Sequence, residues 1–203
     1  MSLVVAVLLT GLLLGWFAGG SLNRLGGVEL RQRRLVVAGL LVQLAGTVVG
    51  GPFYPAGLVL SVLLVLAFLA RNRGLRGTGL VALGLLANAV VVGANGAMPV
   101  SPQATARAGV ATAGLVADPR HELADERTRL SWLGDVVPVP LPYRPEVVSP
   151  GDVLVAAGLA QLVVVGMLAW RAAVPVDRDG RARRALPAVG TGRRPRDRRV
   201  QPW

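Results

Sequence analysis

The chain of 203 residues contains no cysteine and no lysine, and it contains a single histidine. Without cysteine it forms no disulfide, binds no metal through thiolates and has no cysteine nucleophile. Only 16% of the residues are charged, and all 22 basic residues are arginines. This charged fraction is too small for an ordinary soluble domain.

Apolar residues make up 53% of the chain and its mean hydropathy is +0.55. A membrane-spanning helix needs about 20 apolar residues, since each residue adds about 1.5 Å against a hydrocarbon core of about 30 Å. Five segments meet or approach this length, namely 3–20, 35–52, 53–70, 80–96 and 152–170. The sequence therefore predicts an all-α membrane protein with five transmembrane helices.

Two features indicate how the first three segments are connected. The sequence GGPFYP between the second and third segments contains helix-breaking glycine and proline residues, so these segments are predicted to form a helical hairpin. The first segment has no basic residue before its apolar run, whereas a cleaved signal peptide begins with a basic region. We therefore expect the first segment to be retained as a span.

Arginine placement predicts the orientation. Four arginines lie in the loop 21–34, three lie in 71–77, and ten arginines against three aspartates follow residue 170. The segment 95–149 is balanced, with five arginines and six acidic residues. The positive-inside rule then places the N-terminus outside and the C-terminus in the cytoplasm of a cell (inner) membrane. The predicted regions are a four-helix membrane region (1–94), an extracytoplasmic segment (95–151), a fifth span (152–170) and a basic, disordered cytoplasmic tail (171–203).

Four polar residues lie within or at the ends of the predicted spans: Gln43, Asn88, Asn95 and Gln161. Each has small residues nearby at helical spacing, and in the second span this pattern lets another helix approach closely and exchange a hydrogen bond with Gln43. We interpret them as packing contacts between helices. The middle of the predicted spans contains no ionisable residue, which argues against a proton-coupled pump.

The extracytoplasmic segment contains three local start or stop signals. SPGD at 149–152 fits a capping box, with Ser149 as the N-cap and Asp152 as the acid at the third helical position. Ser101 and Pro102 predict a second helix start over 101–117, and the aspartate and proline at 118–119 predict a third over 117–135. Four prolines between 138 and 145 predict extended chain rather than helix or central strand.

The candidate polar cluster of this segment consists of His121, Glu122, Asp125 and Asp135. If 117–135 is helical, His121 and Asp125 lie four residues apart on one face, a spacing that suits two metal ligands. Two ligands do not make a site, and the chain offers no second histidine and no cysteine. We therefore predict no metal and no cofactor, and we interpret these side chains as caps and ion pairs with neighbouring arginines.

Three ordered motifs resemble a known family. NGAMPVS (95–101), RHELADERTRLSWLGDVVPVPLP (120–142) and VVSPGDVLVAAG (147–158) are similar to domain of unknown function family 5317, which comprises uncharacterised bacterial multi-pass membrane proteins. The chain departs from the family pattern at Ala97, Val148 and Pro150, which affects details of the turns. The resemblance implies a shared membrane topology with a cap of proline and aspartate motifs, and it implies no reaction.

Two functions remain open from the sequence. The first is a non-catalytic binding or assembly component of the membrane, in contact with the lipid bilayer and with a membrane protein partner or a second copy of the chain. The second is a membrane-embedded enzyme or permease that uses the segment around His121 as its site. No nucleic-acid binding is expected, because the positive charge lies in orienting loops and in the tail.

Overall fold

A computed structural model describes residues 2–111, 118, 120–142 and 144–168. The chain divides into two compact units, 1–170 and 171–203, and the described residues all belong to the first. The tail predicted at 171–203 lies outside them. The described residues are mostly helical, and their α-helices are α1 (Ser2–Phe17), α2 (Leu22–Gly26), α3 (Arg34–Val49), α4 (Phe53–Arg71), α5 (Thr78–Asn95), α6 (Pro102–Ala108) and α8 (Pro150–Leu168).

Within the described residues, α4, α5 and α8 are long and apolar enough to cross a membrane. The apolar helices α1 and α3 are shorter, with 16 residues each. Both are shorter than the predicted segments, because α1 stops at Phe17, before Gly19 with its φ of 81°, and α3 stops at Gly50, whose φ is 72°. Backbone in this left-handed region ends a helix.

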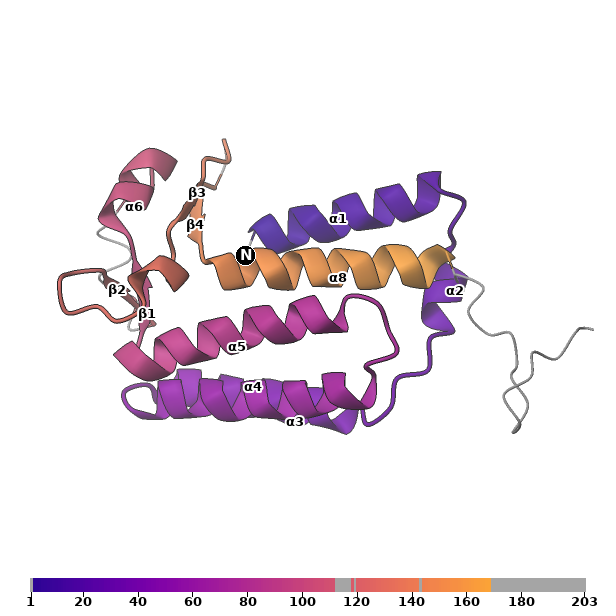
Figure 1. Cartoon of the computed structure of the whole chain (residues 1–203), viewed down its shortest axis with the longest axis horizontal. Helices are drawn as coiled ribbons and strands as arrows, with labels where there is room; N and C mark the ends of the chain where they lie inside the picture. The colour runs from indigo at the N-terminus through magenta and orange to yellow at the C-terminus, as the bar shows by residue number, and fades with distance from the viewer. Residues whose placement is uncertain (1, 112–117, 119, 143, 169–203) are drawn as a thin grey trace, which may run out of the picture. The chain divides into compact units, whose positions relative to one another are not determined.

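The five long helices pack side by side in the order α3, α4, α5, α8 and α1 (Figure 1). The hairpin predicted between the second and third segments is present, since α3 and α4 pack along their length and Gly46 lies against Gly57. Large apolar side chains remain exposed on these helices, such as Phe17 at 86% and Val48 at 77%. An exposed apolar surface of this kind suits contact with lipid.

Two pairs of glycines bring α5 and α8 into close contact. A Cβ atom on Gly158 would lie 2.8 Å from the carbonyl oxygen of Gly77, and one on Gly151 would lie 2.8 Å from that of Gly84. Neither position tolerates a side chain without separating the helices. On its other side α8 packs on α1 through Gly11 and Gly15, whereas Gly19 has no neighbour there.

The segment 96–149, which we call the cap, is not all-α. It contains β1 (Met98–Val100) paired in parallel with β2 (His121–Leu123), and β3 (Val137–Val139) paired antiparallel with β4 (Glu146–Val148). A short 3-10 helix, η1 (Ser131–Leu133), lies between the two sheets along the chain. β3 lies in the proline-rich stretch for which the sequence predicts extended chain.

The helix predicted over 117–135 is wrong. Its described residues form β2, two turns and η1 instead. Backbone hydrogen bonds from Met98 to Arg120 (2.8 Å) and from Ala124 to Val100 (2.9 Å) hold β2 against β1. These bonds to a distant strand override the local start signal at Asp118. The helix predicted from Ser101 ends at Ala108, because Gly109 adopts a φ of 76°; residues 112–117 lie outside the described residues.

A compact apolar core lies where the cap meets α4 and α5. Val91, Val92 and Met98 are its buried members, and Leu133 of η1 is among the side chains that pack against them. The cap therefore rests on the last turns of α5 rather than hanging from it as a loop.

The α5–α8 contact predicts opposite effects for two glycines of one helix. We expect Gly84→Ala to lower the free energy of unfolding by about 1–3 kcal/mol, because its Cβ would overlap the Gly151 carbonyl. Gly79→Ala is the matched control, since nothing lies within 4 Å of its Cβ position; we expect it to be neutral or to stabilise by up to about 1 kcal/mol. Thermal unfolding of the detergent-solubilised protein measures both. Equal effects of the two substitutions would contradict the close helix contact.

Candidate functional site

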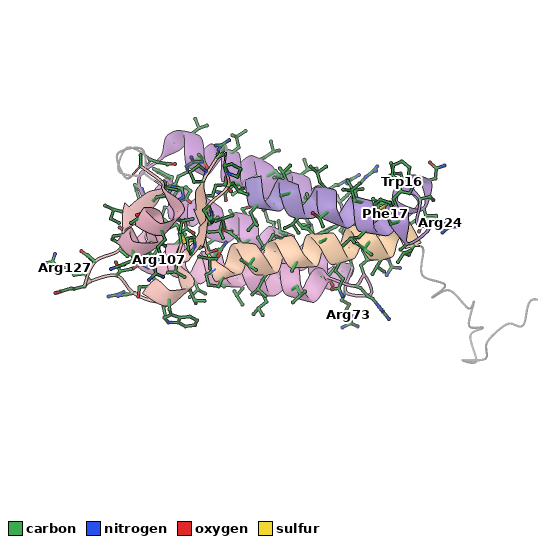
Figure 2. All side chains as sticks on the ribbon, turned by 90° about the horizontal axis from the view of Figure 1, so that it is seen from above. Trp16, Phe17, Arg24, Arg73, Arg107 and Arg127 are labelled. Atoms are coloured by element: carbon green, nitrogen blue, oxygen red, sulfur yellow. The ribbon has the colours of Figure 1, made fainter. Side chains whose placement is uncertain are left out.

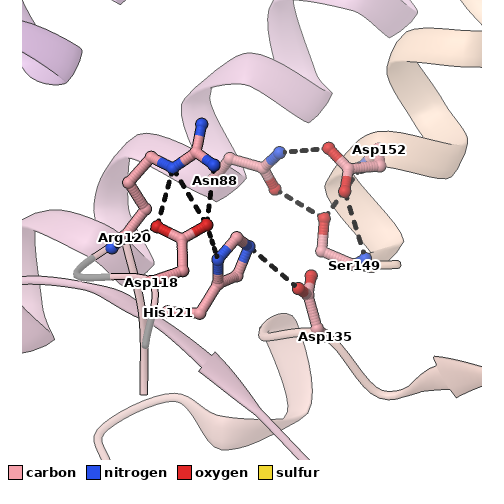
Figure 3. Close-up of polar contacts among 7 residues, drawn as sticks. All are labelled: Asn88, Asp118, Arg120, His121, Asp135, Ser149 and Asp152. Atoms are coloured by element: carbon pink, nitrogen blue, oxygen red, sulfur yellow. Dashed lines mark hydrogen bonds and ion pairs between the residues drawn. The ribbon is translucent and has the colours of Figure 1, made fainter. Parts of the chain in front are cut away.

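Three polar side chains join α5 to the start of α8 (Figure 3). The Ser149 hydroxyl accepts a hydrogen bond from the Asp152 backbone N–H (2.9 Å), and the Asp152 carboxylate accepts one from the Ser149 N–H (3.3 Å). These reciprocal bonds form a capping box. The Asn88 amide donates to Asp152 Oδ1 (2.7 Å) and accepts from the Ser149 hydroxyl (2.9 Å). One side chain of α5 thus binds both capping residues of α8.

A second polar group in the cap is centred on His121 (Figure 3). Its Nδ1 lies 3.3 Å from Asp118 Oδ2, and its Nε2 lies 3.9 Å from Asp135 Oδ2. Arg120 forms two close contacts with the Asp118 carboxylate, from Nε (2.8 Å) and from Nη2 (2.6 Å). These hydrogen bonds from Arg120 hold the pKa of Asp118 well below its usual range.

Asp135 is a buried carboxyl group, with 6% of the residue exposed. Its backbone fixes it in place, because its N–H donates to the Pro99 carbonyl (2.8 Å) and its carbonyl accepts from the Ser101 N–H (2.9 Å). Burial and, to a smaller extent, the negative charge of Asp152 together raise the pKa of Asp135 to about 8. Within the described residues, the only group paired with this carboxyl is the His121 imidazole.

Of the four predicted cluster residues, the structure brings only His121 and Asp135 together. Asp125 is fully exposed and closes its own turn, accepting a hydrogen bond from the Arg127 N–H (2.8 Å) that lowers its pKa. The pKa of Glu122 is raised, mainly by burial and then by the charge of Asp125. In the part of the chain that the structure describes, no hydrogen bond or ion pair joins either residue to His121, and no three His, Asp or Glu side chains are grouped to hold a metal.

Two asparagines at opposite ends of the helices make the same set of contacts. Asn95 bonds both backbone groups of Arg129 in the cap, at 2.8 and 2.9 Å, and donates to the Val91 carbonyl of its own helix (2.9 Å). Asn72 does the same with Arg31, at 2.9 Å to each backbone group, and with the Phe68 carbonyl (2.8 Å). Each side-chain amide donates to a backbone carbonyl and accepts from the N–H of the same residue, as a neighbouring β-strand would. It thereby holds a distant loop against a helix end. We call these two sites the amide clamps.

Among the described residues, no hydrogen bond joins the side chain of either predicted packing glutamine to another helix. Gln43 Oε1 is buried and has no hydrogen-bond partner among the described residues. Gln161 is exposed on α8. The close approach of α3 to α4 therefore depends on Gly39 and Gly46 and not on an amide.

Sequence reasoning missed three residues of these sites. Asp118 was expected to start a helix and Arg120 to form a general ion pair, and neither was expected beside His121. Asn72 follows the third apolar segment directly, and a polar residue at a helix end was the only available signal. Nothing in the local sequence identifies the partner of a clamp, because Asn72 and Arg31 are 41 residues apart.

The imidazole lies within hydrogen-bond distance of the Asp118 carboxylate, whereas its contact with Asp135 is a longer ion-pair distance. A hydrolytic or acyl-transfer site also requires a nucleophile. The Ser149 hydroxyl drawn in Figure 3 is fully buried and donates its proton to Asn88. Among the described residues, the arrangement thus supports proton binding and structural hydrogen bonding.

These features define a mostly helical class of protein, whose described residues include three apolar helices of membrane-spanning length and a cap bonded to helix ends. The chain belongs to the family of unknown function DUF5317, whose model matches residues 27–164. The resemblance inferred from the three motifs is confirmed. The matched region contains α3, α4, α5, the cap and most of α8. No curated protein and no solved structure matches the chain.

The clamps predict local and reciprocal changes in protease sensitivity. Asn95→Ala removes two hydrogen bonds to Arg129 and one to the Val91 carbonyl, and we expect trypsin cleavage after Arg127 and Arg129 to accelerate about tenfold, as for a loss of about 1.4 kcal/mol. Asn72→Ala is the matched control and should sensitise the chain at Arg31 instead. Mass spectrometry of the digests locates the cuts. Cleavage at the same sites in both variants would show general unfolding and would contradict the clamps.

The burial of Asp135 predicts how stability varies with pH. A carboxyl group whose pKa rises from 3.8 to about 8 on folding binds more protons in the folded state. Its stabilising contribution is therefore complete below pH of about 4 and is lost as the pH rises towards about 8. The melting temperature should therefore fall as the pH rises from about 4 to about 8. We expect Asp135→Asn to make this fall smaller, when both chains are compared in a His121→Gln background without the imidazole. The exposed Glu126→Gln is the control. An unchanged slope for Asp135→Asn would contradict the prediction.

Proposed function

We propose that this protein is a multi-pass protein of the cell (inner) membrane with five spans. α1 and α3 join α4, α5 and α8 as crossing helices, although 16 residues extend only about 24 Å. A short span is accommodated by local thinning of the bilayer and by flanking residues. Both short helices lie along longer apolar neighbours, α1 along α8 and α3 along α4, and this packing supports their placement as spans.

The distribution of charge supports the orientation. One end of the helices carries arginines with few acidic residues, including Arg24 and Arg73, beside the exposed aromatic residues Trp16 and Phe17 (Figure 2). The cap at the other end includes Arg107 and Arg127, but its five arginines are balanced by acidic residues. We place the first end in the cytoplasm and the cap on the opposite side of the membrane, with the C-terminus cytoplasmic and the N-terminus outside.

The contacts of α1 with the cap and with α8 support its retention as a span. The backbone N–H of Leu3 donates to the Glu146 carboxylate of β4 (3.2 Å), so an acidic side chain of the cap meets the positive end of α1. Further along, Gly11 and Gly15 lie against Ala160 and Met167 of α8. Removal of α1 would expose this face of α8.

We infer that the protein acts as a non-catalytic binding or assembly component, with a membrane protein or a second copy of itself as its partner. The observation that carries this inference is the use of the polar side chains where the cap meets α5 and α8. Asn88, Asn95, Ser149 and Asp152 all bond the cap to the helices or start a helix. A cap held rigidly on the membrane helices presents a fixed surface, as a binding component requires.

A second candidate function is an enzyme or permease that uses His121. It is favoured by the position of the imidazole between Asp118 and Asp135, and by the pKa of about 8 of the latter. Groups with raised pKa values suit acid–base chemistry near neutral pH. Among the described residues, no three His, Asp or Glu side chains are grouped to hold a metal beside this pair, and for this reason we rank it second.

One crosslinking experiment tests both the orientation and the binding function. An impermeant reagent that joins a thiol to a photoreactive group is applied to intact cells carrying Glu126→Cys in the cap or Gly74→Cys in the α4–α5 loop, both exposed. The chain has no other cysteine. We expect Glu126→Cys to be labelled and, after illumination, to yield a discrete protein adduct, and we expect Gly74→Cys to react only in permeabilised cells.

Two outcomes would contradict this proposal. Equal labelling of both cysteines in intact cells would overturn the orientation. The binding function would be overturned if Glu126→Cys is labelled but gives no protein adduct. The enzymatic function would take its place if, in addition, a small molecule accumulates in His121→Gln cells.

A further inference from the structure

The turn from Arg129 to Leu133 is fixed at the level of the last turn of α5. Asn95, the final residue of α5, bonds both backbone groups of Arg129 at 2.8 and 2.9 Å. At the other end of the turn, Leu133 packs against the core formed with Val91 and Val92 of α5. Because α5 is one of the apolar helices of spanning length, this turn lies at the depth where the span ends.

The remaining side chains of this turn project outwards. Trp132 is 66% exposed and Leu130 is 37% exposed, although Leu133 beside them is turned into the core. Leu130 adopts a φ of 53°, which is uncommon for residues other than glycine. Arg129 is exposed, and its guanidinium has no ion pair within the described residues. The turn thus displays an indole, an aliphatic side chain and a cation together, in a strained backbone conformation.

We propose that Arg129, Leu130 and Trp132 anchor the cap in the headgroup boundary of the lipid bilayer. Trp is the residue most suited to this boundary, because its ring is apolar and its N–H is a hydrogen-bond donor. The guanidinium is the group that reaches a lipid phosphate while its stem remains in the apolar layer. This anchor rests on the proposed position of α5 in the membrane.

The alternative occupant of this surface is a soluble ligand. Trp132 also borders a shallow cleft of about 290 Å³, whose lining includes Gln103, Asp125 and Ser131. The lipid is favoured by three observations on the turn itself: its depth beside α5, the exposed Leu130, and the free cation at Arg129. A ligand of the cleft would leave Trp132 in water in the empty protein, and this difference makes the two occupants distinguishable.

Tryptophan fluorescence tests the anchor in the full-length protein. The chain has four tryptophans, so Trp16→Phe, Trp170→Phe and Trp203→Phe leave Trp132 as the only one. The protein is reconstituted in phosphatidylcholine–phosphatidylglycerol vesicles with bromine on the acyl chain near the headgroup or near the terminal methyl. We expect blue-shifted emission, strong quenching by the headgroup-proximal bromine, weaker quenching by the deep bromine, and weak quenching by aqueous acrylamide.

Two control variants complete the experiment. A chain with Glu126→Trp and Trp132→Phe carries its probe on an exposed part of the cap, and it should be quenched by acrylamide and not by either lipid. Strong acrylamide quenching of Trp132 without lipid quenching overturns the anchor. A chain that retains only Trp16 tests the membrane position separately. If neither brominated lipid quenches Trp16, the proposed span arrangement is overturned as well as the anchor.

Discussion

The close contact between α5 and α8 determines most of the remaining structure. Gly77 and Gly84 lie against Gly158 and Gly151, so the two backbones approach to a distance that no side chain permits. This approach brings Asn88 within hydrogen-bond distance of the first turn of α8. The start of α8, where the chain leaves the cap, is therefore held at one position beside Asn88. A wider separation would break the hydrogen bonds of Asn88 and leave the buried Ser149 hydroxyl without the acceptor of its proton.

Amide side chains extend this connection to the two ends of the helices. Asn95 holds the cap and Asn72 holds the loop before α3, each through both backbone groups of one arginine. Bonds of this type cost little side-chain entropy and leave no buried polar group unpaired at the clamped position. The residues that most resemble a catalytic set, His121 and Asp135, lie in the cap, where Asp135 is buried and His121 is half-buried.

The extent to which the sequence predicts this structure depends on how local each signal is. The approximate positions of the apolar helices, the α3–α4 hairpin and the start of α8 follow from hydropathy, from glycine and proline, and from the four residues of SPGD. β2 does not, because its backbone pairs with a strand 23 residues earlier in the chain. The meeting of Asn88 with Asp152 also cannot be predicted locally, since 64 residues separate them. His121 and Asp135 meet only through that folded cap.

The central claim is that the cap and the helices form one folded unit. Hydrogen–deuterium exchange of the protein in lipid nanodiscs tests it most directly, through the backbone amides of Arg129 and Asp152, which the fold bonds to Asn95 and Ser149. The account predicts that both amides are protected as strongly as those in the last turn of α5. Exchange of the Arg129 amide and of the described cap strands at the rate of unfolded chain, with α5 still protected, would contradict it.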